Sequence, residues 1–398
     1  MAVASTYLTL NATKAQQEIV TKIEPIDIQI LQQQLQAVRN LPRHTDVELM
    51  SGTGLLDPLL DNESREPSFR RLFTHDTWRR YYGRTAKARW LRTLSMWRFS
   101  MIMRTIMPCV FAVFVWAFAI AALLPILVPT VVARAASMWI PLSLQGSAIG
   151  LLLVFRTNNA YLRLAEAREQ WGKLLMLVRS VATKVSVATE YDVTCEACRY
   201  LCAFTWTLRD KLRDGEVRED ILSLLLGKEE AGWISTQRSR PLAILGRLRR
   251  LIYSEYAAGK LDSQVYYFLE TDIKELDMVV ESCERLFSSP IPPNMARHGM
   301  RSLTLWILAL PIVLTASMAP LLVALWTAIT SYIYLGVDEL GAQVEQPFAM
   351  MPLWQLCHLA QLNVEEALST PDLPLRLNRQ SMAIPSVDDA CNSGIPFG

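Results

Sequence analysis

The stretch that decides the fold begins at Arg104 and ends at Arg156: R-TIMPCVFAVFVWAFAIAALLPILVPTVVA-R-AASMWIPLSLQGSAIGLLLVF-R. Its charged side chains are these two arginines and Arg134, which leaves uncharged runs of 29 residues (105–133) and 21 residues (135–155). A helix needs about 20 apolar residues to cross the roughly 30 Å hydrocarbon core of a bilayer. Each run therefore predicts one membrane helix, and the pair forms a hairpin around Arg134.

A third uncharged run, residues 302–337, is too long for one crossing and too short for two crossings joined by an ordered loop. It contains Pro311 and Pro320. Because proline removes a backbone donor and clashes with the preceding turn, the chain should reverse just before Pro320. We expect two helices, roughly 299–315 and 320–337, and hence four membrane crossings in two hairpins.

The basic residues next to the first hairpin indicate its orientation. Eight of them precede the first helix with no acid among them: Arg79, Arg80, Arg84, Lys87, Arg89, Arg92, Arg98 and Arg104. Such residues stay on the side of synthesis during membrane insertion. Both termini and the segment between the hairpins should therefore lie on one inner side, which in an organelle protein is cytosol or stroma.

The segment between the hairpins, residues 157–298, has a helical pattern. Apolar residues from Tyr161 to Val185 recur at spacings of three and four, so a helix of about seven turns continues inward from the second membrane helix. Another helix starts at Asp262, an N-cap candidate, and ends before Pro290. Two more helical stretches are expected, near residues 192–213 and 241–258. No strand alternation occurs in the sequence, so we predict an all-α chain with long helices extending into an inner-side helical domain.

Composition sets the remaining boundaries. We expect a flexible polar N-terminal segment (1–64) with one modest helical stretch at 28–38, a basic juxtamembrane segment (65–104), the first transmembrane hairpin with its pore helix (105–156), the inner-side helical domain (157–298), the second transmembrane hairpin (299–345), a C-terminal helical segment (346–370) and a flexible tail (371–398). No arginine precedes Arg39, and Glu18 is acidic, so the sequence contains no clear transit peptide.

Other functional classes find no support in the sequence. The 40 basic and 38 acidic residues give a net charge of +2 and are interleaved away from the membrane runs, which argues against nucleic-acid binding. No serine-hydrolase elbow, phosphate-binding loop or dinucleotide fingerprint is present, and pairs such as Glu229-Glu230 fall on solvated helical surfaces. We therefore expect that this protein is not an enzyme.

The seven cysteines could suggest metal or disulfides. Cys195, Cys198 and Cys202 have helical spacing, whereas structural zinc usually needs pairs of ligands on turns and a fourth donor. Core packing is the favoured interpretation, and the four histidines are scattered. We therefore expect neither a metal site nor a cofactor.

The second membrane helix has an unusual composition, with small and polar residues Pro141, Ser143, Gln145, Gly146, Ser147 and Gly150. Such residues let helices pack closely or face water. Two interpretations remain open. In one these residues form a helix-packing seam; in the other Ile140, Leu144 and Ala148, spaced four apart, form a face that narrows a water-filled path.

The sequence of residues 145–161, QGSAIGLLLVFRTNNAY, followed by Arg163, Glu166-Ala167-Arg168 and Trp171-Gly172, resembles the signature of the bestrophin and bestrophin-like chloride channel family. Two further blocks are similar to the family: PIPP (290–293) with Arg297-His298, and GVDELG (336–341) continuing to EQPF (345–348). The stretch LFTHDTW (72–78) resembles the plant and algal branch, the voltage-dependent chloride channels of thylakoids. The resemblance covers about residues 72–370.

This resemblance implies a homopentamer in which the second helix of each subunit lines a pore for chloride and other monovalent anions, surrounded by membrane lipid. Three apolar residues one turn apart form the neck of such pores, the first directly before a proline, and this pattern matches Ile140, Leu144 and Ala148. Ala148 is smaller than the usual residue, so the inner end of the neck should be wider. The inner constriction falls at Gln264 or Val265, where glutamine would be a weaker barrier than the isoleucine of some members.

Positive potential near an apolar neck favours anions. Arg156 would supply it if it faces the pore axis, with Asn158 as an amide donor. The alternative is that Arg156 snorkels toward water or pairs with Glu166 or Glu339.

Calcium, location and the conducted ion complete the expectations. Animal bestrophins place acids after the Pro-Phe block, but here Pro347-Phe348 is followed by AMMPL, so calcium should not gate this chain. A plastid thylakoid membrane is the first expectation, with the plasma membrane or another organelle membrane as the alternative. Besides a chloride channel, the pattern is compatible with a bicarbonate-conducting channel of an algal carbon-concentrating system or with a non-conducting membrane scaffold.

Overall fold

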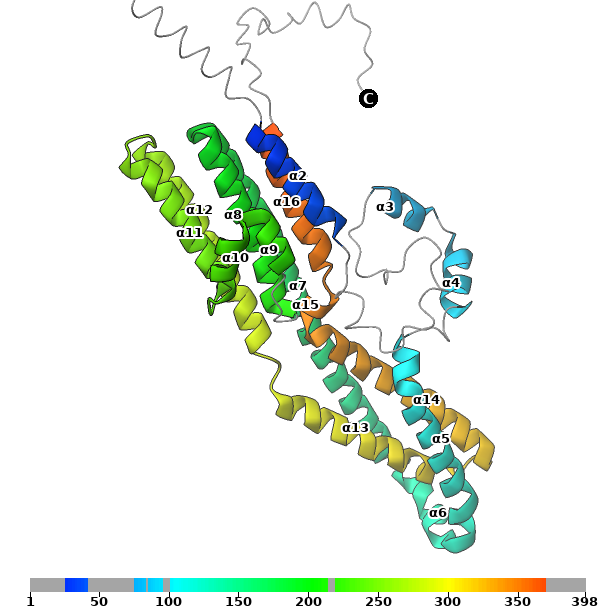
Figure 1. Cartoon of the computed structure of the whole chain (residues 1–398). Coiled ribbons are helices and arrows are strands. Elements are labelled where there is room, and N and C mark those ends of the chain that lie inside the picture. The colour runs from blue at the N-terminus through cyan, green and yellow to red at the C-terminus, as the bar shows by residue number, and fades with distance from the viewer. Residues whose placement is uncertain (1–25, 42–74, 84, 96–100, 214–218, 370–398) are drawn as a thin grey trace, which may run out of the picture.

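The computed structural model describes residues 26–41, 75–83, 85–95, 101–213 and 219–369. Every regular element in these ranges is a helix, and no strand occurs in them. The helices form an elongated molecule with a membrane half at one end and an inner domain at the other (Figure 1). The predicted all-α fold is confirmed.

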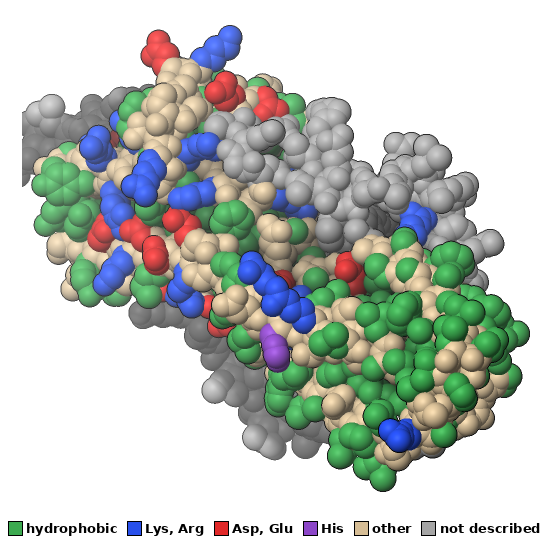
Figure 2. Space-filling model, turned by 90° about the horizontal axis from the view of Figure 1, so that it is seen from below, with side chains coloured by type: hydrophobic (Ala, Val, Ile, Leu, Met, Phe, Trp, Pro, Cys, Tyr) green, Lys and Arg blue, Asp and Glu red, His purple; other side chains and the backbone are tan. Residues whose placement is uncertain are grey.

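The membrane half consists of α5 (Met101–Leu127), the first part of α7 (Trp139–Ala188), α13 (Pro293–Leu314) and α14 (Pro320–Glu345). A short helix, α6 (Pro129–Ala135), and a 3-10 turn (Ala136–Met138) join α5 to α7. Helix α14 packs against both α5 and α7, and α13 contacts the same two helices. Figure 2 shows hydrophobic side chains covering this half, while charged side chains gather over the other.

Three of these helices, α5, α7 and α14, are long and apolar enough by length and composition to cross a membrane. Helix α13 is shorter and carries Arg297 and Arg301 in its first part, so its apolar stretch starts later. The predicted reversal is confirmed: α13 ends at Leu314 and α14 begins with Pro320, whose missing N–H costs nothing in a first turn.

The most prominent element is α7, one helix of 50 residues that belongs to both halves of the molecule. At a rise of about 1.5 Å per residue it is roughly 75 Å long. Pro141 lies in its first turn, where a backbone donor has no intrahelical partner, and no proline follows up to Ala188. The predicted inward continuation of the second membrane helix is therefore confirmed, without a break at residue 156.

The inner domain adds seven helices to the inner part of α7: α8 (Tyr191–Arg213), α9 (Glu219–Leu226), α10 (Lys228–Ser235), α11 (Arg240–Ala257), α12 (Ser263–Ser288), α15 (Pro347–Met350) and α16 (Leu353–Ser369). Of these, α8, α12, α15 and α16 pack against α7. Their shared core includes the fully buried Trp171, Phe204 and Trp206. Arg213 fixes the link between α15 and α16, because its guanidinium donates to the carbonyls of Ala349 (3.0 Å) and Met351 (3.4 Å).

The cysteines of α8 lie in this core. Cys195, Cys198 and Cys202 are buried, as the helical spacing predicted. In the described part of the chain, no group of three or more histidine, cysteine or acidic residues could hold a metal ion. Their burial agrees with the expected core packing.

The N-terminal segment differs from the expectation of flexibility. Residues Ile26–Asn40 form α2, which packs against α8, α9 and α16. Its Leu31, Leu35 and Val38 are fully buried, and Arg39 forms an ion pair with Glu365. The basic segment contains α3 (His75–Tyr82) and α4 (Ala86–Ser95), while the rest of 1–64 and the tail 371–398 lie outside the described residues.

Candidate pore-lining surface

One side of α7 in the membrane half packs against α13 and α14. We call this side the packing face; it contains the buried residues Leu142, Gly146, Ile149 and Leu153. The indole nitrogen of Trp306 donates to the Leu142 carbonyl (2.8 Å), and its ring lies directly over Gly146. A Cβ at position 146 would be 2.6 Å from Trp306 Cζ2, so only glycine fits here without a shift.

The opposite side of α7 is exposed in the described chain. It contains Ile140 (68% exposed), Leu144 (66%) and Ala148, followed along the same direction by Leu151, Phe155 and Asn158. At about 100° per residue these six positions share one face, which we call the neck face. It lies nearly opposite the packing face on the helix.

The two interpretations of the second membrane helix therefore concern different faces of it. Gly146 serves close packing, and Gly150 lies near Tyr334, to whose hydroxyl an added Cβ would be 3.8 Å distant. Ser143 and Ser147 are exposed beside the neck face and donate to the carbonyls of Ile140 (2.8 Å) and Ser143 (3.2 Å). Glycine thus marks the seam, and the apolar residues four apart mark the uncovered face.

Arg156 does not lie on the neck face, which differs from its expected role of attracting anions. Its guanidinium pairs with the buried carboxylate of Asp338 on α14, and Nη2 lies 4.0 Å from Glu345 Oε2. The alternative partners expected from the sequence are engaged elsewhere: Glu166 pairs with Arg285, and Glu339 accepts from Gln343. The reason is helical geometry, since position 156 is turned about 160° from Ile140. Asn158 shares the neck face.

The proposed inner constriction lies at the far end of the molecule. Asp262 caps α12 by accepting from the backbone N–H of Gln264 (2.8 Å). Gln264 is exposed, whereas Val265 is half-buried against the core. The predicted start of this helix is confirmed, and of the two candidates Gln264 is the one available to solvent.

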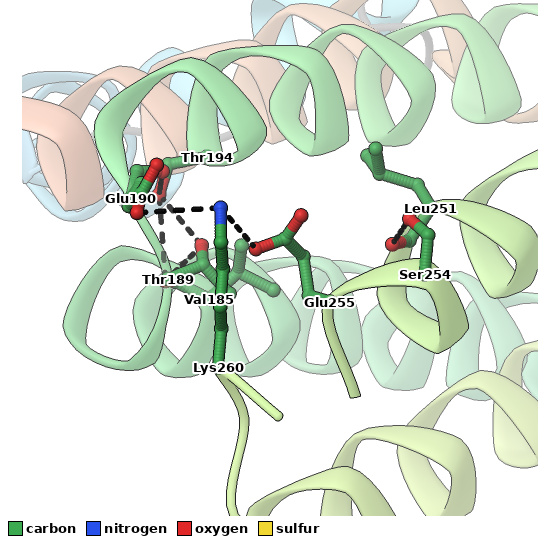
Figure 3. Close-up of polar contacts among 8 residues, drawn as sticks. All are labelled: Val185, Thr189, Glu190, Thr194, Leu251, Ser254, Glu255 and Lys260. Atoms are coloured by element: carbon green, nitrogen blue, oxygen red, sulfur yellow. Dashed lines mark hydrogen bonds and ion pairs between the residues drawn. The ribbon is translucent and has the colours of Figure 1, made fainter. Parts of the chain in front are cut away.

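Lys260 in the loop before α12 contacts two carboxylates, as Figure 3 shows. Its Nζ lies 3.3 Å from Glu190 Oε1, at the start of α8, and 3.7 Å from Glu255 Oε2 on α11. The hydrogen bond to Glu190, together with the charges of both carboxylates, raises the pKa of Lys260. These contacts join three elements at the end where Gln264 is located.

One residue that connects three helices was not recognised from the sequence. Arg163 on α7 donates to backbone carbonyls at the ends of α12 and α14. Its place in the signature stretch gave no role. Pro290 was the available signal, because a proline leaves the carbonyl four residues earlier, that of Leu286, without its helical donor.

Taken together, the four-helix membrane half, the inner helical domain and the uncovered apolar face define an integral membrane protein built around one long helix. Comparison with known proteins identifies the family. A family model described as Bacterial/Fungal Bestrophin protein matches residues 83–366. The chain belongs to the bestrophin family.

Two named relatives are similar to this chain over about three quarters of their own length. The chain is 29% identical over 324 residues to voltage-dependent chloride channel 2, chloroplastic, of Arabidopsis thaliana, covering 78% of this chain and 76% of the relative. It is 29% identical over 240 residues to the voltage-dependent anion channel-forming protein sll1024 of Synechocystis, covering 56% and 75%. A crystal structure of a bacterial bestrophin homologue from Klebsiella pneumoniae aligns with a TM-score of 0.55 at 26% identity, covering 60% of this chain and 95% of that one.

Proposed function

We propose that this protein is an anion channel that conducts chloride passively through a homopentameric pore, and that it is not an enzyme. The observation that carries the proposal is the exposed neck face of a helix whose opposite side, the packing face, is buried. Five such faces around one axis would bring together rings of Ile140, Leu144 and Ala148. The relatives in Arabidopsis and Synechocystis are named as a chloride channel and an anion channel-forming protein, which supports the same function.

The neck residues suit an anion path for a physical reason. Large apolar rings block ions mainly by excluding water, so ions that lose hydration at low cost pass more readily. Chloride is such an ion compared with small cations. The ring of Ala148 would be wider than those of Ile140 and Leu144, which places the narrowest part toward the outer end of the neck.

Helix orientation adds a preference for negative charge. Helix α7 begins at Trp139, so Ile140 and Leu144 lie in its first two turns. The N-terminal end of a helix carries a partial positive charge, which favours anions nearby. Asn158 would add amide donors at the inner end of the neck face, and because Arg156 is paired with Asp338 we assign it no part in attracting ions.

Gln264, next to the half-buried Val265, is proposed as the inner constriction at the end of the inner domain far from the membrane half. A thylakoid membrane is the proposed location, supported by the chloroplastic relatives.

Recording from the purified full-length protein in planar lipid bilayers tests the proposal. With a gradient of potassium chloride, currents should reverse near the chloride equilibrium potential. Leu144→Ala should increase the conductance severalfold because it widens a narrow ring. Leu321→Ala serves as the matched control, since Leu321 is a similarly exposed apolar residue (56%) on α14, and it should leave the conductance unchanged.

The outcomes separate the alternatives. Reversal near the potassium potential would refute anion conduction, and an assembled protein without current would indicate a membrane scaffold. Equal conductance of Leu144→Ala and Leu321→Ala would refute the assignment of the neck. Replacing chloride by bicarbonate or nitrate then ranks the conducted anions.

A further inference from the structure

Arg163 joins the ends of two helices to α7. Its Nη2 donates to the carbonyl of Leu286 (2.6 Å), Nη1 to that of Ser289 (2.7 Å) and Nε to that of Glu345 (3.3 Å). The first two carbonyls are at the C-terminal end of α12, and the third belongs to the last residue of α14. Terminal carbonyls of a helix have no intrahelical donor, and Pro290 cannot supply one to Leu286. A forked cation can satisfy all three at once.

The helix held by Arg163 carries the proposed inner constriction at its other end. Helix α12 has 26 residues, which corresponds to about 39 Å. Gln264 lies in its first turn, and Leu269, Ile273, Leu276 and Cys283 along it are fully buried. We expect a helix packed in this way to move as one body, so that a displacement at Ser289 would be transmitted to Gln264.

The same arginine is rigidly connected to the proposed neck. Arg163 and Ala148 lie on one unbroken helix, 15 residues apart, or about 22 Å. Contacts further along keep α7 and α12 antiparallel: Asp272 accepts from Ser180 (2.8 Å) and Lys184 (2.7 Å), and Arg285 pairs with Glu166 (2.6 Å). Among these residues, Arg163 is the one that also contacts α14, through the Glu345 carbonyl.

We infer that Arg163 is a positioning residue that couples the inner constriction to the neck, so that the two widen and narrow together. The inference rests on the proposed channel function, because it needs both constrictions to lie on the ion path. Arg163 touches no permeating ion in this mechanism. It acts by holding the C-terminal ends of α12 and α14 against α7. The Arg156–Asp338 pair holds α14 against α7 about two turns closer to the neck.

A purely structural brace would give a different result from a coupling residue. Loss of a residue with a structural role alone lowers stability and the amount of assembled protein, but the effects of changes at the two constrictions on conductance stay independent of each other. Loss of coupling makes the effect of a change at one constriction depend on Arg163. A double-mutant cycle measures this dependence directly.

The experiment uses the full-length protein in planar bilayers and four forms: wild type, Arg163→Gln, Gln264→Leu and the double variant. Gln264→Leu should lower the conductance of the wild type, because it makes the inner constriction more apolar. In the Arg163→Gln background this reduction should change at least twofold. Arg168→Gln replaces Arg163→Gln in the control cycle; Arg168 is an exposed arginine on the same helix with no polar contact in the described chain, and its cycle should be additive.

Hydrogen exchange provides a readout that needs no current. Arg163→Gln should speed amide exchange in residues 263–268, at the far end of α12, whereas Arg168→Gln should not. If Arg163→Gln does not assemble, Arg163→Lys is used in both measurements, because it keeps the charge and loses only the fork.

Additive conductance effects together with unchanged exchange at 263–268 would overturn the inference. A wild type without current would instead refute the proposed function, and the exchange measurement would then decide whether Arg163 connects the two ends of α12.

Discussion

Gly146 on the packing face of α7 offers a quantitative test of how the membrane helices fit together. A Cβ at this position would lie 2.6 Å from Trp306 Cζ2 and 3.0 Å from Cε2, so about 0.8 Å of displacement is needed to reach ordinary contact at roughly 3.4 Å. The indole cannot move freely, because its Nε1 donates to the Leu142 carbonyl (2.8 Å) and its ring packs on Tyr334. Gly146→Ala must therefore separate α7 from α13 or weaken this hydrogen bond.

The magnitude follows from three contributions. Overpacking of this kind costs about 1–3 kcal/mol, and a weakened hydrogen bond costs about 1 kcal/mol. Replacing glycine by alanine within a helix stabilises the helix by about 1 kcal/mol, which offsets part of these costs. The net loss should be about 2 kcal/mol.

Gly150→Ala is the matched control, one turn away on the same helix. An added Cβ there would meet Tyr334 Oη at 3.8 Å, an ordinary contact, so only the gain in helix propensity of about 1 kcal/mol applies. Thermal unfolding in detergent, followed by tryptophan fluorescence, should show Gly146→Ala melting several degrees below Gly150→Ala. Equal melting temperatures, or a more stable Gly146→Ala protein, would refute the close packing described for Trp306.

Four further predictions concern other parts of the molecule. Arg156→Gln should destabilise the protein by about 3–5 kcal/mol because it leaves the buried Asp338 carboxylate without its partner. In unfolding experiments, combining Arg156→Gln with Asp338→Asn should recover much of this loss. Neither protein should differ from the wild type in its chloride-to-sodium permeability ratio. Leu35→Ala, at a fully buried position of α2, should cost about 2–4 kcal/mol, whereas Ile30→Ala on the exposed side (39%) should cost under about 1 kcal/mol; equal melting curves would contradict the packing of α2. Burial raises the pKa of the Cys283 thiol from 9.0 to about 12, so at pH 9 only about one-thousandth of it is thiolate, compared with half of an ordinary thiol. A thiol reagent should therefore label Cys283 only after the protein is unfolded, which mass spectrometry can check. A calcium chelator should leave the current unchanged, and its collapse on chelation would show that calcium gates the channel.

The parts of the fold that were predictable are those specified by local sequence. Charge-free runs indicate membrane helices because a buried core helix seldom stays free of charge for the roughly 20 residues that a crossing needs. Asp262 marked the start of α12 because a carboxylate at that position accepts from the next turn, and the structure has this bond. Pro320 marked the second hairpin for an equally local reason.

Short helices and distant contacts were not predictable. Helices α9 and α10 have eight residues each, too few for an apolar period to stand out. The stretch that forms α2 was recognised as modestly helical, but its burial depends on helices α8, α9 and α16 elsewhere in the chain.

The candidate site shows the same limit. Position 156 was recognised as basic and close to the neck, and its spacing from Ile140 already turns it away from that face. Its partner Asp338 is 182 residues away, so only the fold identifies the pair. The role of Arg163 was missed for a similar reason, because its three acceptors are backbone carbonyls from two other helices, which no side-chain pattern reveals.

The contact between α2 and α16 has a consequence for biosynthesis. Arg39 and Glu365 are 326 residues apart, and α2 cannot bury Leu31, Leu35 and Val38 fully until α16 has left the ribosome. Both membrane hairpins are made in that interval, so the earliest helix of the described chain is among the last to pack. Until then its apolar side remains exposed on the inner side, where a chaperone can bind it, and a chain truncated before α16 should stay in that state.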